Sequence, residues 1–225
     1  MQRIIQAFRK LRRAKESGIS LVELLVAMVL LGVASTIVIG LFLSATQTVS
    51  MASAIHNDTG TASNVMNAVS KAIRSGTTVR VSGAPNAPAL ITATPTELVM
   101  YSLADSDAVD PRPVRIEFTR DPTSLQLVEK RWAPAAAANG FWDFTAPTLI
   151  SSRTFPGALT NGNVFTYNTA AGDAVPAPTA AQLGLIASVT VEVTVHGDAR
   201  ASGTPVILKN TVGMPNLGFS ETETP

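Results

Sequence analysis

Glu23 is the one charged side chain in a long apolar stretch of this chain. Val22 and Leu24 flank it, and residues 24–55 hold no charged residue. An ionised carboxylate is costly in an apolar medium unless a cation accompanies it. A segment that served only as an anchor would have no use for such a group. We therefore expect Glu23 to be a functional residue that pairs with a cation.

Two histidines and one acidic segment are the other candidates for proton transfer or metal binding. His56 and His196 lack convergent partners in the sequence, so we interpret both as surface residues. Asp105, Asp107 and Asp110 place three carboxylates within six residues, a grouping that suits calcium. The central glycine and terminal glutamate of an EF-hand loop are absent. We interpret this segment as a solvated acidic loop, keep calcium as the weaker alternative, and predict no cofactor.

Four aromatic residues gather in one stretch of the chain: Trp132, Phe141, Trp142 and Phe144. Aromatic side chains at this density could stack on a sugar or cover the end of a sheet. We expect the second role, because large apolar rings are usually buried against neighbouring side chains.

Basic residues near the same stretch alternate with acidic ones. The basic ones are Arg112, Arg115, Arg120, Lys130 and Arg131, and the acidic ones are Glu117, Asp121 and Glu129. A nucleic-acid surface concentrates positive charge, so this mixed pattern predicts a solvated face and no nucleic-acid partner. The chain also lacks a phosphate-binding loop, a dinucleotide fingerprint and a serine–histidine–aspartate pattern. We therefore predict that it is not an enzyme.

The apolar stretch is long enough to cross a membrane. Its strongly apolar part is residues 21–45, and crossing about 30 Å of hydrocarbon takes roughly 20 helical residues. Residues 1–18 carry six basic side chains and one acidic one, whereas the rest of the chain carries 11 basic and 15 acidic ones. The positive-inside rule then places the basic segment in the cytoplasm and the residues after 45 outside. This predicts a single pass through the plasma (inner) membrane.

Two simpler interpretations of this segment remain open. A cleavable secretory signal is one, because Ala52-Ser53-Ala54 matches its small-residue cleavage pattern. The apolar run exceeds the about 7–15 residues typical of such a signal, however, and the alanines lie well beyond its end. A plain anchor is the other, and it leaves Glu23 unexplained. Either one would make the protein a secreted or membrane-anchored binding domain.

A second helical pattern follows the membrane segment. Apolar residues recur at helical spacing, namely Ala62, Val65, Met66, Val69, Ala72 and Ile73. Lys71 and Arg74 suit the last turn of a helix, and Gly76 suits the position after it. We expect one helix over residues 20–75, with a break into two helices near residues 57–60 as the alternative.

Beyond residue 76 the apolar pattern changes to alternation. Val114, Ile116 and Phe118 alternate with polar residues, and a turn at residues 121–123 leads to a second strand over residues 125–130. Further strands are expected at residues 98–103, 150–155, 164–167, 189–195 and 206–212. Residues 133–140 and 169–181 are expected to be loops. The chain contains no cysteine, so the core must stabilise this part without disulfides. The predicted fold class is α+β, a long N-terminal helix packed on an antiparallel β-sheet.

The junction between the basic segment and the apolar run resembles the N-terminal signal of type IV pilin-like proteins. Residues 18–32 read Gly-Ile-Ser-Leu-Val-Glu-Leu-Leu-Val-Ala-Met-Val-Leu-Leu-Gly. The family pattern is a basic leader ending in glycine, then an apolar residue, threonine or serine, two apolar residues and glutamate. The family includes major and minor pilins and the pseudopilins of type II secretion and competence systems.

The resemblance implies a processing step and a set of partners. A prepilin peptidase would cut after Gly18, and the new amine of Ile19 would be methylated. Glu23 would be the assembly glutamate, paired with the N-terminal amine of a neighbouring subunit. The implied partners are the peptidase, other pilin or pseudopilin subunits through the N-terminal helix, the membrane, and an assembly platform in the inner membrane. The assembled filament would lie at the cell surface.

The resemblance also suggests how the chain is organised and which branch of the family it is most like. It implies a leader (1–18), a transmembrane and assembly helix (19–45), an amphipathic continuation (46–76) and a β-rich domain (77–225). Ile19 stands where the family usually has phenylalanine. Gly40 stands where major pilins commonly carry a helix-kinking proline. The second departure favours a minor pilin, similar to the PilW and type II secretion J types, over a major pilin, with a secretion or competence pseudopilin as the alternative.

Overall fold

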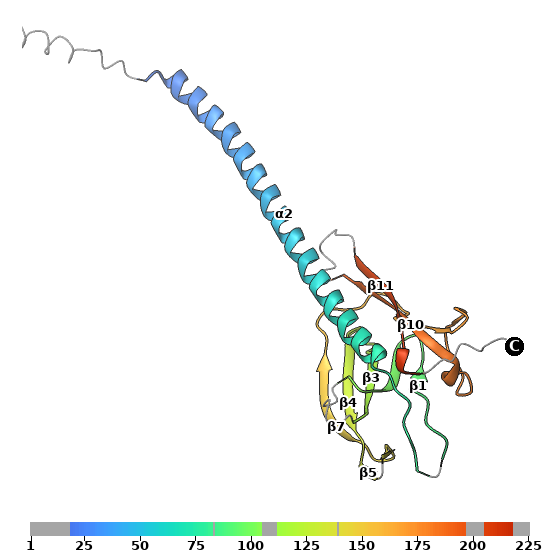
Figure 1. Ribbon diagram of the computed structural model, residues 1–225. Coiled ribbons are helices and arrows are strands. Elements are labelled where there is room, and N and C mark those ends of the chain that lie inside the picture. Colours follow the sequence, from blue (N-terminus) through green and yellow to red (C-terminus); the bar gives the residue numbers. More distant parts are fainter. Residues whose placement is uncertain (1–18, 83, 105–111, 139, 197–204, 218–225) are drawn as a thin grey trace, which may run out of the picture. The chain divides into compact units, whose positions relative to one another are not determined.

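The computed structural model describes residues 19–82, 84–104, 112–138, 140–196 and 205–217 (Figure 1). The three aspartates proposed as calcium ligands and Gly18 lie outside these residues. The chain divides into two compact units, Met1–Ser50 and Met51–Pro225.

The described part of the first unit is almost entirely helix. Helix α2 (Leu21–Arg74) begins there, and every described side chain up to Ser50 is exposed. Gly32 and Gly40 do not interrupt it. The predicted long helix is confirmed, with its ends one residue inside the expected ones. Thr36 also donates its hydroxyl to the carbonyl oxygen of Gly32 at 2.9 Å, so this polar side chain is satisfied by its own helix.

Residues 57–60 continue the helix without a break, so the alternative of two helices is wrong. The hydroxyl of Thr59 donates to the carbonyl oxygen of Ile55 at 2.8 Å, so the helix itself satisfies this polar group. Beyond this point the helix becomes amphipathic. Its buried residues are Ala62, Val65, Met66, Val69, Ser70, Ala72 and Ile73. They include all six apolar positions that the helical spacing predicts.

The larger sheet of the second unit has five antiparallel strands in the order β1-β2-β3-β4-β7. The strands are β1 (Leu90–Ala93), β2 (Glu97–Ser102), β3 (Val114–Arg120), β4 (Leu127–Ala133) and β7 (Thr148–Thr154). The predicted hairpin is β3–β4, and its buried Ile116 and Phe118 lie on one face. Strand β1 was not predicted, because four residues are too few to display an alternating pattern.

A second antiparallel sheet has the order β11-β10-β8-β9. Its strands are β8 (Phe165–Thr169), β9 (Ala174–Val175), β10 (Ile186–Val195) and β11 (Val206–Gly213). The sequence predicted the segments of β8, β10 and β11 as part of a single sheet, and the structure corrects this. Strand β11 pairs with β10 and not with the larger sheet, because β10 is long enough to bind β8 and β11 along its two edges.

Two segments expected to be loops contain short strands. Strands β5 (Ala136–Ala138) and β6 (Phe141–Asp143) form a hairpin, and β9 pairs with β8. Single turns of 3₁₀ helix follow at η1 (Leu183–Leu185) and η2 (Pro215–Leu217). Backbone hydrogen bonds override the weak strand propensity of alanine in β5.

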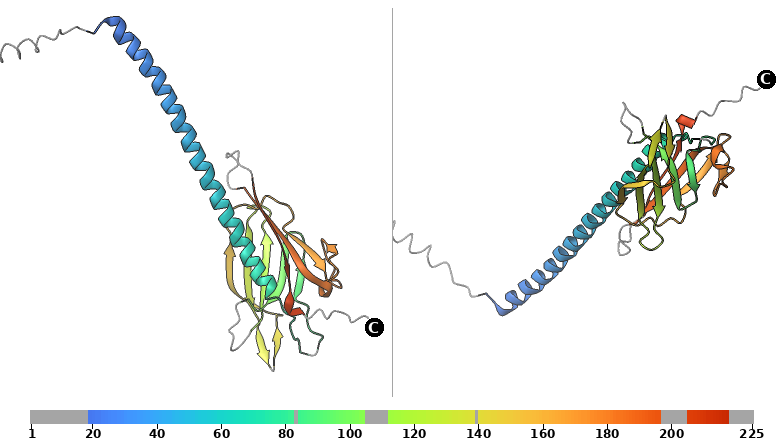
Figure 2. Two further views of the ribbon diagram at one scale, coloured as in Figure 1. Left: turned by 45° about the horizontal axis from the view of Figure 1, so that its top comes forward. Right: turned by 90° about the horizontal axis from the view of Figure 1, so that it is seen from below.

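The core of the second unit is one cluster that draws side chains from α2 and from both sheets. Figure 2 shows residues 51–74 of α2 running along the sheets. Strand β10 contributes four valines at alternate positions, Val189, Val191, Val193 and Val195, all fully buried. Tyr167 is also fully buried, and its hydroxyl lies 2.9 Å from the carbonyl oxygens of Thr94 and Glu97. Burial raises the pKa of this hydroxyl, which stays protonated and able to donate.

The prediction of a solvated charged face is only partly right. Glu117 lies between Arg115 and Lys130, with N–O distances of 3.7 and 3.6 Å, and these side chains share the outer face of the β3–β4 hairpin. Glu129 is 2% exposed and lies on the opposite face, across from the buried Phe118. The solvated interpretation is therefore wrong for Glu129. The physical reason is strand alternation, which turns residue 129 to the same side as the buried Leu127.

Candidate functional site

The start of α2 carries the residues that the sequence singled out. Ile19 and Ser20 precede the helix, and the amide of Leu24 donates to the carbonyl oxygen of Ser20 at 3.0 Å to close its first turn. Glu23 lies in that first turn. The unpaired amide groups and the positive end of the helix dipole favour a carboxylate at this position. The local structure therefore holds Glu23 at a fixed place four residues after Ile19.

The surroundings of Glu23 are apolar and open. Ile19 is 72% exposed and Leu21 is 80% exposed. Among the described residues, α2 is the one helix long and apolar enough to cross a membrane, and its most apolar stretch buries nothing against the rest of the chain. An apolar surface of this size is covered by lipid or by other protein chains.

No described residue forms a hydrogen bond or an ion pair with the Glu23 side chain. The next acidic or basic residue along α2 is Asp58, more than 30 positions away. Within the described part of the chain, the arrangement can therefore offer a carboxylate to a cation that arrives from outside.

The histidines lie on separate elements. His56 is exposed on α2, and His196 follows the end of β10. No group of three or more histidine, aspartate or glutamate side chains that could hold a metal occurs among the described residues. Since the three aspartates lie outside those residues, calcium binding stays a prediction.

Two of the four aromatic residues, Trp132 and Phe144, pack at one end of the larger sheet, whereas Phe141 and Trp142 lie on β6 of the small hairpin. Trp132 pairs across the strands with Arg115, whose guanidinium lies 5.4 Å from the Trp132 ring centre. The Phe144 ring lies 4.7 Å from that of Tyr101, the neighbour of Arg115 on β2. Burial raises the pKa of Tyr101 while the positive charge of Arg115 partly offsets the rise. These half-buried contacts are those of a packed sheet end.

One group of polar residues was not predicted as a site. Arg153 on β7 and Arg131 on β4 both bind the buried Glu129. The sequence contained one signal, since Leu127, Glu129 and Arg131 alternate on the inward face of β4. The partner Arg153 lies 24 residues further along the chain, and no pattern in the sequence indicates the register of β7 that brings it beside Glu129.

A family model described as the prokaryotic N-terminal methylation motif matches residues 13–39. The match covers Gly18, Ile19 and Glu23 and ends within the apolar part of α2. No curated protein matches the chain. The matched motif, the long apolar helix and the antiparallel sheets together support the resemblance to type IV pilin-like prepilins.

Proposed function

We propose that this protein is a minor structural subunit of a type IV pilus-like filament that acts in filament assembly or priming. The observation that carries the proposal is the position of Glu23. It lies in the first turn of an unburied apolar helix, within a matched methylation motif and without a partner among the described residues. The proposal includes no catalytic role and no cofactor.

The proposed mechanism begins with cleavage after Gly18, which creates an amine on Ile19 that is then methylated. Before assembly the subunit resides in the inner membrane with α2 in lipid. Its leader faced the cytoplasm before cleavage, and its second unit lies outside. During assembly, Glu23 of the entering subunit pairs with the Ile19 amine of its neighbour. Each charge is costly alone in an apolar bundle and tolerable as a pair, so pairing fixes the axial register of the helices.

The choice of a minor subunit rests on Gly40, which stands where major pilins commonly carry proline. A pseudopilin of a secretion or competence system is the second candidate, because it uses the same helix and the same motif. In that case the filament would move a secreted substrate or take up DNA. Deleting the gene separates the two: loss of surface pili favours the pilus, and loss of secretion or transformation favours the pseudopilin.

The N-terminus of the mature protein tests the proposal. We expect mass spectrometry of protein from its native cells to find a chain that begins at methylated Ile19. An intact leader would contradict the proposal, and so would cleavage after Ala54.

Assembly is tested by Glu23→Ala beside the isosteric Glu23→Gln. Both variants should be processed normally. Immunogold labelling should not detect them in sheared filaments, because the amine of the neighbouring subunit would be left unpaired. A loss of roughly 3–5 kcal/mol on breaking such a pair is enough to abolish incorporation. Incorporation of Glu23→Ala at the wild-type level would show that the carboxylate has no assembly role.

A further inference from the structure

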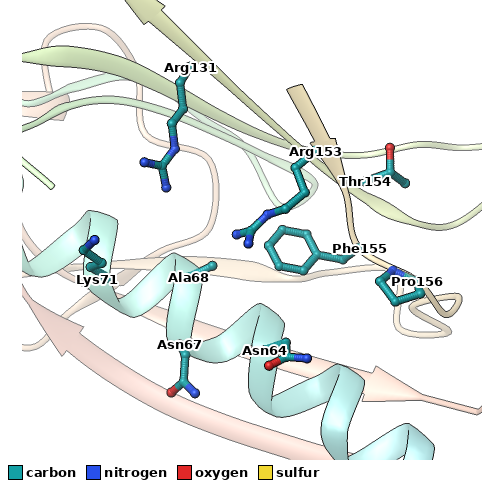
Figure 3. Close-up of a pocket in the computed structure, with 9 residues that line it drawn as sticks. All are labelled: Asn64, Asn67, Ala68, Lys71, Arg131, Arg153, Thr154, Phe155 and Pro156. Carbon is teal, nitrogen blue, oxygen red and sulfur yellow. The ribbon is translucent and has the colours of Figure 1, made fainter. Parts of the chain in front are cut away.

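A pocket of about 510 Å³ lies within the second unit, between α2 and the edge of the larger sheet (Figure 3). Asn64, Asn67 and Lys71 line it from the helix, and Arg131, Arg153 and Phe155 line it from the sheet side. The three helix residues are exposed and recur every three to four positions. They therefore form one stripe along α2. The pocket plays no part in the proposed assembly mechanism.

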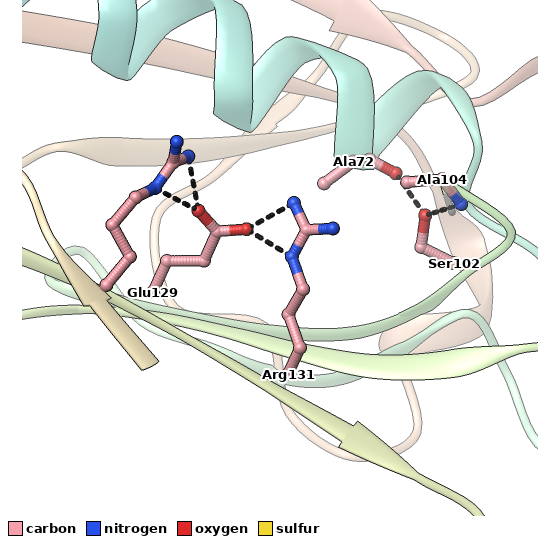
Figure 4. A network of polar contacts seen from close by, with 6 residues as sticks. Ala72, Ser102, Ala104, Glu129 and Arg131 are labelled. Carbon is pink, nitrogen blue, oxygen red and sulfur yellow. Dashed lines mark hydrogen bonds and ion pairs between the residues drawn. The ribbon is translucent and has the colours of Figure 1, made fainter. Parts of the chain in front are cut away.

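Both arginines of the pocket are anchored by one buried carboxylate (Figure 4). Arg131 donates through Nε to Glu129 Oε1 at 2.6 Å. Arg153 donates through Nε and Nη2 to Glu129 Oε2 at 3.1 and 2.6 Å. Glu129 carries one negative charge, which the two guanidinium groups share. It also holds both in fixed positions, which lowers the entropy lost when they bind a further group.

Arg153 is the side chain best placed to receive a ligand. It is 56% exposed, whereas Arg131 is 18% exposed. Its guanidinium lies 4.3 Å from the centre of the Phe155 ring. Figure 3 shows it directed toward the helix side of the pocket. Nε and one hydrogen of Nη2 bind Glu129, so the two hydrogens of Nη1 and the second hydrogen of Nη2 remain as donors on a rigid planar fork.

The two guanidinium groups influence each other. Burial lowers the pKa of Arg131, and the nearby positive charge of Arg153 lowers it further. The two guanidinium groups therefore repel each other, and an anion bound beside them would reduce that repulsion.

The helix side supplies donors of a second kind. Asn64 and Asn67 carry amide groups, and Lys71 carries an ammonium group. Amide and ammonium hydrogens both bind oxygen acceptors. No carboxylate is among the residues described as lining the pocket, and Glu129, the acid that binds its arginines, is 2% exposed. All charged side chains on the described walls are thus cationic.

We propose that this pocket binds a ligand through an oxyanion, a carboxylate or a phosphate group, held by the outer edge of Arg153 and by the donors of the α2 stripe. The planar fork of Arg153 matches the paired oxygens of either group. Glu129 acts as a positioning residue, because it orients both arginines from behind without contacting the ligand.

Isothermal titration calorimetry of the full-length chain in neutral detergent at low salt tests the proposal. One titration uses inorganic phosphate and the other uses glutarate, a dicarboxylate that carries the same group as an acidic side chain. We expect saturable binding of at least one probe, weakened by added sodium chloride. Binding of phosphate alone assigns a phosphate-bearing ligand, and binding of glutarate alone assigns an acidic protein or metabolite group. Saturation by neither probe overturns the proposal.

Two variants and a matched control locate the binding. Arg153→Gln removes the presented fork, and Asn67→Asp places a negative charge in the pocket at an exposed helix position. Each should weaken binding about tenfold or more, the size expected for one charge-assisted contact. Lys209→Gln removes a cation on β11 that is 63% exposed and lies on the other sheet, and it should leave the affinity unchanged.

The variants are checked for folding by circular dichroism. Should Arg153→Gln fail to fold, Asn67→Asp decides alone. Wild-type affinity in Asn67→Asp would overturn the proposal, as would an equal loss in Lys209→Gln. These titrations use purified protein outside any filament, so their result is independent of the assembly role of Glu23.

Discussion

Glu23 and Glu129 are two glutamates in opposite surroundings. Glu23 lies on an exposed apolar helix with no described partner, whereas Glu129 is 2% exposed and binds two arginines. A carboxylate in apolar surroundings needs a cation wherever it lies. The second unit supplies that cation to Glu129 from its own strands. For Glu23 we propose that a neighbouring subunit supplies it.

The buried network gives a residue-scale prediction. Glu129→Gln keeps the side-chain volume but leaves two guanidinium groups close together without a carboxylate. We expect it to lower the free energy of unfolding by about 3 kcal/mol, as for other broken buried pairs. Urea unfolding of the full-length chain in detergent, followed by circular dichroism, measures the change.

Glu117→Gln is the matched control, because Glu117 lies on the neighbouring strand and makes ion pairs on the outer face. Loss of such a half-exposed pair should lower the unfolding free energy by less than about 1 kcal/mol. Equal effects of the two variants would mean that the buried network does not stabilise the fold.

At the scale of elements, α2 serves both units with one continuous backbone. Its apolar spacing changes along its length: residues up to 50 are exposed all around, and from Ala62 onward one stripe is buried. The helix ends at Arg74, where the hydroxyl of Ser102 on β2 donates to the carbonyl oxygen of Ala72 at 3.0 Å. The amide of Ala104 donates to the same hydroxyl at 3.1 Å. The bond from Ser102 satisfies a carbonyl group that the end of the helix leaves unpaired.

Replacing glycine by alanine should change the free energy of unfolding in opposite directions at two positions of this region. Gly60 is exposed inside α2, and a Cβ there would meet nothing within 4 Å. Gly60→Ala should raise the unfolding free energy by about 0.5–1 kcal/mol, because alanine loses less backbone entropy in a helix. A Cβ at Gly76 would lie 2.8 Å from Met100 Cε and 3.0 Å from the Ile73 carbonyl oxygen.

Gly76→Ala should therefore lower the unfolding free energy by about 1–3 kcal/mol, since the fully buried Met100 has little room to move. Thermal unfolding of the two variants should shift in opposite directions from that of the wild-type chain. A shift in the same direction would show that the tight packing around Gly76 is absent in solution.

At the scale of the whole molecule, all buried side chains of the described chain belong to the second unit. The described part of the first unit, residues 19–50, contributes no buried side chain to a core. The second unit thus holds the core that stabilises the fold, and the first unit holds the helix segment that we propose lies in the membrane. This separation suits a subunit that must leave lipid for a filament while its folded part stays intact.

Removing the residues before Met51 tests this separation. The shortened chain should be soluble without detergent and should unfold cooperatively, because it retains α2 from Met51 onward and both sheets. Its midpoint of thermal unfolding should lie within a few degrees of that of the full-length chain in detergent. An aggregated or unfolded product would show that the first unit is needed for folding.

The sequence alone determined the features that depend on local spacing. The apolar length of residues 21–45 and the six buried apolar positions of α2 follow from composition and helical period, and the Gly18–Glu23 pattern was recognised by its resemblance to a known signal. The β3–β4 hairpin follows from alternation across one turn, so the α+β class was predictable. Only the tertiary structure decided that the strands divide into a five-stranded sheet, a four-stranded sheet and the β5–β6 hairpin, and that Glu129 faces Arg153. These outcomes depend on which strands pair over long separations, and an alternating pattern specifies a buried face without specifying the partner strand.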